Sequence, residues 1–295
     1  MFSILIHEDL DIMSPQKAPV EVPDSLYDLP YAGQGISGIV KILDEHHVIK
    51  SPHQRSLEEA AVERKIYQRL GDHPRITKVI EYHKRGIIME RLHGPLRKRL
   101  IDLKAADKRT TTEEILRWSM QATEGFQYIH SKGVFQVDIS AGNIVFDDED
   151  NLKLVDFAGS SMDGSQPIAL AGEREQHPDF LHPVLPTVIS ELFALGTIMY
   201  EIEHGEKYLP DADPRYCEIE EGYKAGKFPN TEGFLVDSVI QKCWRSEYHD
   251  AGEVLADLER IRREHFDSIN SGDPSKGIAS ATNEHTDIAA HKMPW

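Results

Sequence analysis

Residues 135–160 read FQVDISAGNIVFDDEDNLKLVDFAGS, and this stretch decides how the rest of the chain is interpreted. Asp138 and Asn143 lie five positions apart in a polar loop between short apolar runs, and Asp156 follows the next apolar run. Each of them alone could form an Asx turn. As a set, Asn143 and Asp156 offer the oxygen ligands that a phosphate-bound magnesium ion prefers. Asp138 then remains free to accept a proton from a hydroxyl group.

A glycine-rich stretch lies about a hundred residues upstream. Residues 33–41 read GQGISGIVK, with Gly33, Gly35 and Gly38 in the spacing G-x-G-x-x-G and Val40 two positions later. Glycines let a backbone approach phosphates closely and donate N–H groups to them. A dinucleotide-binding motif would need a helix to begin inside the glycines, but here a β-type run continues. The pattern favours a hairpin that lies over phosphates, and a plain glycine turn between strands is the alternative.

A lysine and a glutamate follow this hairpin. Lys50 ends the strand-like run HHVIK, and Glu63 shares one face of a predicted helix with Ile66, Tyr67 and Leu70. A carboxylate on a buried face needs a cation beside it, and Lys50 is the natural partner. The alternatives are a solvated lysine at a strand end and a solvated glutamate beside Arg64.

Hydrophobic periodicity divides the chain into a β-rich N-terminal region and a helical C-terminal region. A single helix is expected in the β-rich region, beginning at a capping box formed by Ser56 and Glu59 and ending at Gly71. In the helical region the pattern predicts long helices over 113–133 and 189–205, with helical pieces near 234–244 and 251–265. Residues 1–25 are expected to form an arm, and residues 266–295 a disordered tail.

Composition and charge exclude several classes of protein. Fifty acidic residues against 33 basic ones give a net charge of −17, which argues against nucleic acid and anionic membranes as main partners. No run is long and apolar enough to span a membrane, and the start of the chain lacks the basic residues of a secretion signal. Cys217 and Cys243 are the two cysteines, so a disulfide framework is excluded. We expect a reduced intracellular compartment, the cytoplasm or the nucleus.

These motifs, in this order, resemble those of eukaryotic-type protein kinases: a glycine-rich loop, a strand lysine, a helix glutamate, a catalytic loop and DFG. Further along, HPDFL at 177–181 stands in the place of the family's APE motif, and IQKCWRSEY at 240–248 resembles its late Cys-Trp segment. The resemblance covers about residues 26–265 and is closest to a divergent group of fungal kinase-like proteins. It implies an α+β bilobal fold. The N-lobe, residues 26–92, would hold a small antiparallel sheet and one regulatory helix, and the C-lobe, residues 93–265, would be mainly helical.

The resemblance also implies a role for each candidate residue. Lys50, paired with Glu63, would hold the phosphates of ATP, Asn143 and Asp156 would bind Mg²⁺, and Asp138 would act on the acceptor hydroxyl. Met89 would stand behind the adenine, and Glu90 to Leu92 would form the hinge beside it. The whole nucleotide site would comprise Gly33, Gly35, Gly38, Val40, Val48, Lys50, Met89, Glu90, Leu92 and Val145.

Several framework positions depart from the family pattern, namely Gln136, Val137, Ser140, Ala158, Asp179, Glu191 and Ala251. Val137 replaces an arginine that clasps a phosphate on the activation loop, so regulation through loop phosphorylation is less expected, although Ser160, Ser161 and Ser165 are available. Ser140 replaces a lysine near the transferred phosphoryl group, which removes a positive charge there. Asp179 and Ala251 replace both members of one ion pair.

The five chemical positions are intact, so we expect an ATP- and Mg²⁺-dependent kinase that phosphorylates a protein hydroxyl, with Ser/Thr favoured over Tyr. Two alternatives stay open. One is a pseudokinase that acts as an ATP-binding or nucleotide-free interaction module, and the other is a kinase of a small molecule. The sequence indicates a protein substrate as the partner and leaves the oligomeric state open.

Overall fold

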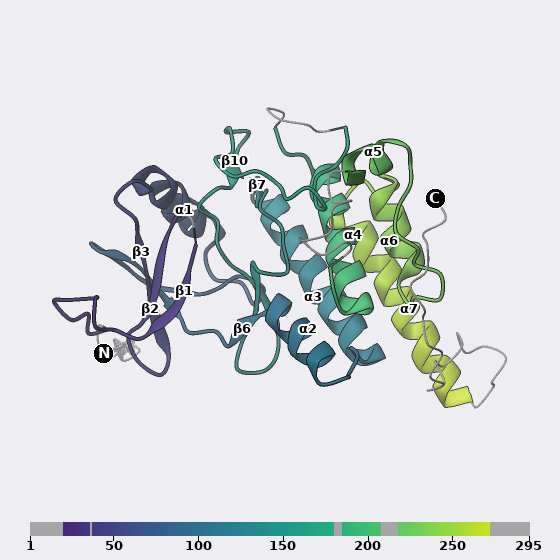
Figure 1. Cartoon of the computed structure of the whole chain (residues 1–295), viewed down its shortest axis with the longest axis horizontal. Helices are drawn as coiled ribbons and strands as arrows, with labels where there is room; N and C mark the ends of the chain where they lie inside the picture. The colour runs from purple at the N-terminus through teal and green to yellow at the C-terminus, as the bar shows by residue number, and fades with distance from the viewer. Residues whose placement is uncertain (1–19, 36, 180–184, 208–217, 272–295) are drawn as a thin grey trace, which may run out of the picture.

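The computed structural model describes residues 20–35, 37–179, 185–207 and 218–271. The chain forms two lobes, one built on a β-sheet and the other built on helices (Figure 1). This is the bilobal α+β architecture that the motif order implies. Among the described residues, no helix is long and apolar enough to cross a membrane.

The N-terminal lobe contains a five-stranded antiparallel sheet in the order β1-β2-β3-β5-β4. Its strands are β1 (Tyr31–Gln34), β2 (Gly38–Ile42), β3 (His47–Pro52), β4 (Val79–His83) and β5 (Gly86–Glu90). Lys50 sits on the central strand β3, where it pairs with Val40 of β2 and Ile87 of β5. The sheet thereby fixes the backbone position of this lysine from both sides.

Helix α1 (Leu57–Leu70) packs on this lobe and buries Glu63, Ile66, Tyr67 and Leu70, which is the predicted face. Its end is also as predicted, because Gly71 follows it with φ 60°, in the region that favours glycine. The expected capping box is wrong. The backbone of Ser56, at φ −119° and ψ 30°, is not extended, and its side chain makes no capping hydrogen bond.

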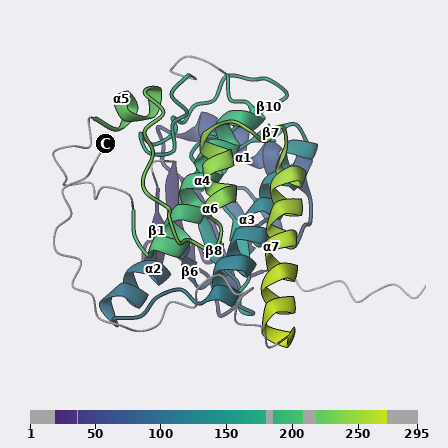
Figure 2. The same cartoon turned by 90° about the vertical axis from the view of Figure 1, so that its right-hand side faces the viewer.

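The C-terminal lobe is built from six described helices, and the longest of them form its core. They are α2 (Leu96–Ala105), α3 (Thr112–Ser131), α4 (Val188–His204), α5 (Ile219–Lys224), α6 (Asp237–Trp244) and α7 (Ala251–Ser271). Helix α4 is buried along most of its length, and α3 packs against both α4 and α7 (Figure 2). A helix that is apolar on every side can be stable only inside such a core.

Short strands hold the stretch from Phe135 to Ser160. Strands β8 (Ile144–Phe146) and β9 (Leu152–Leu154) pair with each other, and β8 also pairs with β6 (Gly94–Pro95). Strand β7 (Val134–Phe135) pairs with β10 (Ser161–Met162). The polar loop with Asp138 and Asn143 is therefore anchored at both ends by β-structure.

The two ends of the chain differ from the sequence prediction to different degrees. Helix α7 continues to Ser271, so the boundary predicted near Phe266 is wrong by about one and a half turns. Pairs such as Arg260–Glu264, spaced four residues apart, stabilise the part of this helix that the sequence predicted. Residues 272–295 and 1–19 lie outside the described residues. From the predicted arm, Val22 and Asp24 are bound through their carbonyl oxygens to Arg85.

Candidate active site

Lys50 is the centre of the candidate site because it joins two remote carboxylates. Its Nζ lies 2.8 Å from Glu63 Oε1 and 2.9 Å from Asp156 Oδ1. Glu63 also accepts the Phe157 N–H at 3.3 Å, so helix α1 is tied to the segment that carries Asp156. The sequence predicted the first of these ion pairs. The second joins residues 106 positions apart, and only the fold brings them together.

The charge on Lys50 is stabilised by these neighbours. Burial by itself lowers the pKa of the ammonium group, but the attraction of Glu63 and Asp156 outweighs it, so the pKa of Lys50 lies above its ordinary value. The side chain of Lys50 is 8% exposed and that of Glu63 is 3% exposed. A permanent positive charge therefore stands at the wall of the site.

Asp138 and Asn143 face the same space from the loop that precedes β8. The Asn143 amide donates to the Asp138 carbonyl oxygen at 2.8 Å and to Asp138 Oδ2 at 3.1 Å. Asp138 is exposed at the mouth of the site, yet the protein around it removes enough water to raise the pKa of its carboxyl group. The hydrogen bond from Asn143 opposes this rise, and the negative charge of Asp156 adds to it.

The orientation of these groups leaves oxygen atoms for a cation. Because Asn143 donates through its amide nitrogen, its Oδ1 atom stays available, and Asp156 uses Oδ1 rather than Oδ2 for Lys50. These two atoms could hold a divalent cation together with oxygens from a ligand. Among the described residues, no group of three or more His, Cys, Asp or Glu side chains is arranged to hold a metal ion without such a ligand.

All the candidate residues except Gly38 line one cavity of about 610 Å³ between the lobes. Val40, Val48, Met89 and Val145 form an apolar portion of its wall. Beside them, the Leu92 N–H and carbonyl take part in no hydrogen bond with the rest of the described chain. An apolar wall with free backbone groups beside it suits an aromatic ring that carries hydrogen-bonding atoms.

The three glycines of the loop play different roles. Gly33 and Gly35 line the cavity, and a Cβ on Gly35 would lie 3.4 Å from Asp156 Oδ2. Gly38 lies in β2 instead, where a Cβ would meet the Ser51 carbonyl oxygen at 2.5 Å. Close packing of β2 on β3 therefore accounts for this glycine, and Gly38 does not share the cavity with the other two.

The segment after Asp156 also reaches the cavity, which the sequence pattern did not predict. Ile168 and Ala169 line it, and their N–H groups both donate to the Gly159 carbonyl oxygen at 3.0 Å. A Cβ on Gly159 would lie 2.1 Å from that of Ala169, so only glycine allows this fold-back. In the DFAG stretch the glycine stands at position 159, one position later than in the family pattern. This shift was the sequence signal that could have predicted the fold-back. The residue with a left-handed backbone is Asp156, whose φ is 62°. Gly159 is instead required because Ala169 packs directly against it.

Two of the serines expected to be available for phosphorylation are buried, so that expectation is wrong. Ser160 is 1% exposed and donates to the Gln136 carbonyl oxygen at 3.0 Å, and Ser161 is fully buried and donates to the Ser165 carbonyl oxygen at 2.6 Å. Ser161 lies in β10 and pairs with Phe135 of β7, and Ser160 directly precedes this strand. Ser165 is exposed.

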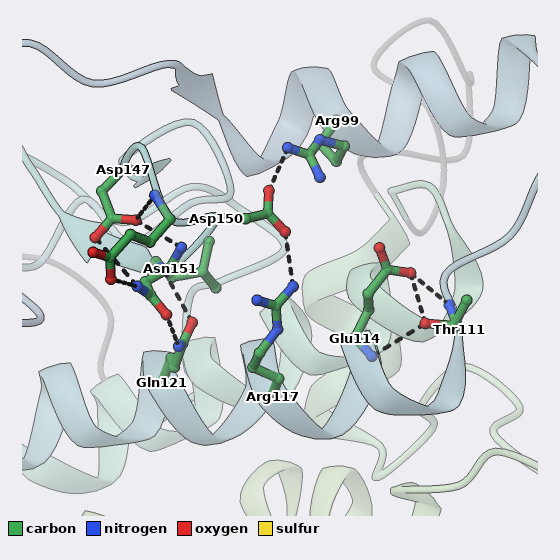
Figure 3. Close-up of polar contacts among 10 residues, drawn as sticks. Arg99, Thr111, Glu114, Arg117, Gln121, Asp147, Asp150 and Asn151 are labelled. Carbon is green, nitrogen blue, oxygen red and sulfur yellow. Dashed lines mark hydrogen bonds and ion pairs between the residues drawn. The ribbon is translucent and has the colours of Figure 1, made fainter.

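Polar contacts join the turn between β8 and β9 to helices α2 and α3 (Figure 3). Asp150 accepts from Arg99 of α2 at 2.6 Å and from Arg117 of α3 at 2.7 Å. Gln121 of α3 donates to Asn151 at 2.8 Å. Burial by itself would raise the pKa of Asp150, but the two guanidinium groups outweigh it and the net shift is downward. These contacts position β8, which Asn143 directly precedes, and β9, which ends two residues before Asp156.

In the C-lobe, a hydrogen-bonding contact joins two segments that the family pattern joins by an ion pair. Asp179 is exposed, and His177 two positions earlier contacts Ser246 through its Nε2 atom at 2.9 Å. This contact joins the segment before α4 to the segment after α6. The loss of the arginine at position 251, where Ala251 stands, therefore leaves the two segments connected.

Comparison with known proteins agrees with this geometry. Residues 33–242 match the family described as protein kinase domain. The chain is 27% identical over 195 residues to CBL-interacting serine/threonine-protein kinase 16 of Arabidopsis thaliana, an alignment that covers 59% of this chain and 39% of that protein. It is 26% identical over 264 residues to serine/threonine-protein kinase CST20 of Candida albicans, which covers 80% of this chain and 21% of that protein.

A third relative is serine/threonine/tyrosine-protein kinase HT1 of Arabidopsis thaliana, 23% identical over 187 residues, or 61% of this chain and 47% of that protein. The matches thus span less than half of each of these relatives. The family match over residues 33–242 includes parts of both lobes and nearly all the residues that line the cavity. The family match, the bilobal fold and the Lys50 ion pairs agree, and the chain belongs to the protein kinase domain family.

Proposed function

We propose that this chain is an active protein kinase that transfers the γ-phosphoryl group of ATP to a hydroxyl group of a protein, with Mg²⁺ as the metal and Ser/Thr preferred over Tyr. The observation that carries the proposal is the position of Lys50, which contacts Glu63 and Asp156 at once. In this arrangement the Lys50–Glu63 pair holds helix α1 against the sheet. Lys50 and Asp156, the carboxylate that would bind the metal, both line one cavity. Serine/threonine kinases among the relatives support the same reaction.

The cavity suits ATP in its shape and its polarity. The apolar wall that includes Val48 and Met89 would accept the adenine, and the free backbone groups of Leu92 would bind its edge. Gly33 and Gly35 would cover the phosphates, where Lys50 supplies a positive charge. The volume of about 610 Å³ lies within the range of small-molecule and cofactor sites.

The oxygen atoms left free at Asp156 and Asn143 fit a magnesium ion that is also bound to phosphate. When bound, this ion neutralises phosphate charge that the protein leaves uncompensated. Asp138 would orient the acceptor hydroxyl and take its proton. Its raised pKa suits it to hold that proton.

One observation favours a pseudokinase as the second candidate. Among the described residues that line the cavity, Lys50 is the one Lys or Arg side chain. Ser140 stands where the family has a lysine, and its hydroxyl accepts the Gly142 N–H at 3.2 Å. The phosphates would thus meet less positive charge than usual. A small-molecule kinase remains a minor alternative, and the close packing of Gly196 of α4 against Cys243 of α6 is better suited to a protein-kinase C-lobe.

Calorimetric titration with ATP, with and without Mg²⁺, tests the site without knowledge of the acceptor. Wild type, Lys50→Met and Asp156→Ala are compared, and Lys98→Met, an exposed change on α2, is the control. Mg²⁺-dependent binding that both site variants lose and the control keeps would support the proposal. Transfer of labelled phosphate to a peptide library, abolished by Asp138→Asn, would then establish the activity. Binding without transfer would favour the pseudokinase, and no binding by folded wild type would exclude a nucleotide-dependent enzyme.

A further inference from the structure

Ser37 stands in the hairpin between β1 and β2, directly before the first residue of β2. It lines the candidate nucleotide cavity together with Lys50 and Asp156. Ser37 is 8% exposed, and its hydroxyl group is buried and has no hydrogen-bond partner in the described part of the chain. The glycine spacing gave no indication of this hydroxyl, and its lack of a partner calls for an explanation.

The backbone around Ser37 is held in place, whereas its side chain is not. The Ser37 carbonyl oxygen accepts the His53 N–H at 3.1 Å, and the Gly35 N–H donates to the Gly38 carbonyl oxygen at 3.0 Å. These two hydrogen bonds fix the hairpin at Ser37 itself and across it. Because χ1 of serine has three staggered positions, a rotation about its Cα–Cβ bond can direct the hydroxyl group into the cavity without movement of the loop.

The part of the cavity beside Ser37 suits an anion. A Cβ on Gly35 would lie 3.4 Å from Asp156 Oδ2, the oxygen left free for a cation, so the hairpin covers that carboxylate. Lys50 uses two of its three N–H donors on Glu63 and Asp156, and the third forms no hydrogen bond within the described chain. A phosphate group bound to the same cation would therefore meet donors from Lys50 and from the hairpin.

The site has a particular need for a further donor. Lys50 is the one Lys or Arg side chain among the described residues that line the cavity, and Ser140 stands where the family has a lysine near the transferred phosphoryl group. A hydrogen bond to a charged oxygen is roughly twice as strong as one between neutral groups. The Ser37 hydroxyl group can therefore supply part of the stabilisation that the missing positive charge would give to the phosphates.

We propose that the Ser37 hydroxyl group donates a hydrogen bond to a phosphate oxygen of the bound nucleotide, which makes Ser37 a further binding residue of the candidate site. This contact rests on the proposed function, because it needs a nucleoside polyphosphate in the cavity. It recognises the phosphates and makes no contribution to the binding of the adenosine part.

Calorimetric titration of the full chain with ATP, ADP and adenosine, all in the presence of Mg²⁺, tests this contact. Ser37→Ala should lower the affinity for ATP by roughly tenfold, the loss expected when one hydrogen bond to a charged group is removed, and should leave the affinity for adenosine unchanged. Ser37→Cys, which keeps the volume of the side chain but has a weak donor, should show the same loss. A similar loss with ADP would assign the contact to the first two phosphates, and a loss with ATP alone would assign it to the γ-phosphate.

Ser51→Ala is the matched control. Ser51 lies on β3, and its hydroxyl group is also buried and without a partner among the described residues, but Ser51 does not line the cavity. This variant should bind all three ligands as wild type does. Because neither hydroxyl group has a partner within the described chain, both alanine variants should unfold near the wild-type temperature.

Three results would contradict the proposal in different ways. If wild type binds ATP and Ser37→Ala binds it equally well, the contact is excluded and the proposed function is unaffected. An equal loss of affinity for ATP and adenosine would also overturn the proposal, since Ser37 would then act through the packing of the hairpin. Wild type that binds no ATP would overturn the proposed function, and the Ser37 contact with it.

Discussion

Glu191 accepts the backbone N–H of Val137 at 2.7 Å, so the buried helix α4 holds the residue directly before Asp138. The other carboxylate oxygen of Glu191 lies 2.8 Å from His130 Nε2. Val137 has φ 69°, a conformation that β-branched residues rarely adopt. Glu191 therefore compensates a strained backbone, and it does so at a position where the family pattern has the shorter aspartate.

Glu191→Asp, which introduces the family residue, should destabilise this protein. The shorter side chain cannot reach both Val137 and His130, and a buried N–H group without a partner costs about 1–3 kcal/mol. Urea unfolding should show this loss. Glu191→Gln keeps the length and an acceptor for Val137, so its loss should be smaller. Equal stability of Glu191→Asp and wild type would show that the fold does not depend on this reach.

Gly38→Ala and Gly33→Ala should distinguish a glycine that strand packing requires from a glycine that lines the cavity. A Cβ at Gly38 would meet the Ser51 carbonyl oxygen at 2.5 Å, whereas at Gly33 nothing lies within 4 Å. Overpacking against backbone costs typically about 1–3 kcal/mol, so thermal unfolding should detect Gly38→Ala and not Gly33→Ala. A neutral Gly38→Ala would mean that β2 and β3 can separate to accept the methyl group.

Ser140→Lys should increase the rate of phosphoryl transfer, given the proposed function. The change adds a positive charge beside the loop of Asp138, where the lining of the cavity otherwise depends on Lys50. A gain of about tenfold corresponds to about 1.4 kcal/mol of added transition-state stabilisation. Steady-state kinetics with one acceptor would measure it, and Ser140→Met, similar in length and uncharged, is the control. A similar rate in both variants would show that charge at this position does not limit the reaction.

A buried carboxylate in α4 should make stability depend on pH. Glu201 is fully buried, 2.9 Å from Arg97, and burial raises its pKa to about 7 although Arg97 opposes the rise. Glu175 nearby adds to it. The folded state holds the proton of Glu201 more tightly than the unfolded state does. The stabilisation that this proton provides is therefore fully present below about pH 4.5. It is lost as the pH rises through about 7.

Glu201→Gln imitates the protonated form and should remove this dependence. Near pH 5 the variant and wild type should have similar free energies of unfolding. At pH 8 the variant should be more stable, by up to about 3 kcal/mol for the full shift. Chemical unfolding at the two pH values measures the difference, and Glu203→Gln is a comparison on the same helix. A variant that is less stable than wild type at pH 8 would show that the Arg97–Glu201 pair outweighs the cost of burial.

Much of this protein follows from the sequence alone, because the decisive signals are local. The helical period around Glu63 identified its buried face, and Gly71 marked where that helix ends, since only glycine easily adopts the backbone found there. The need of a buried carboxylate for a cation was enough to link Glu63 to Lys50 across thirteen positions of sequence. The order of the motifs was enough to identify the family and its two lobes.

Tertiary structure decided the contacts between segments that are remote in sequence. Asp156 joins Lys50 across 106 positions, and Ala169 folds back on Gly159 to line the cavity. Ser160 looks exposed in a polar sequence but is drawn inward beside β7. Burial of a side chain depends on what packs over it, and no local pattern contains that information. Motif spacing and the resemblance to protein kinases therefore predicted the components of the candidate site, and packing between the lobes determined which of them meet.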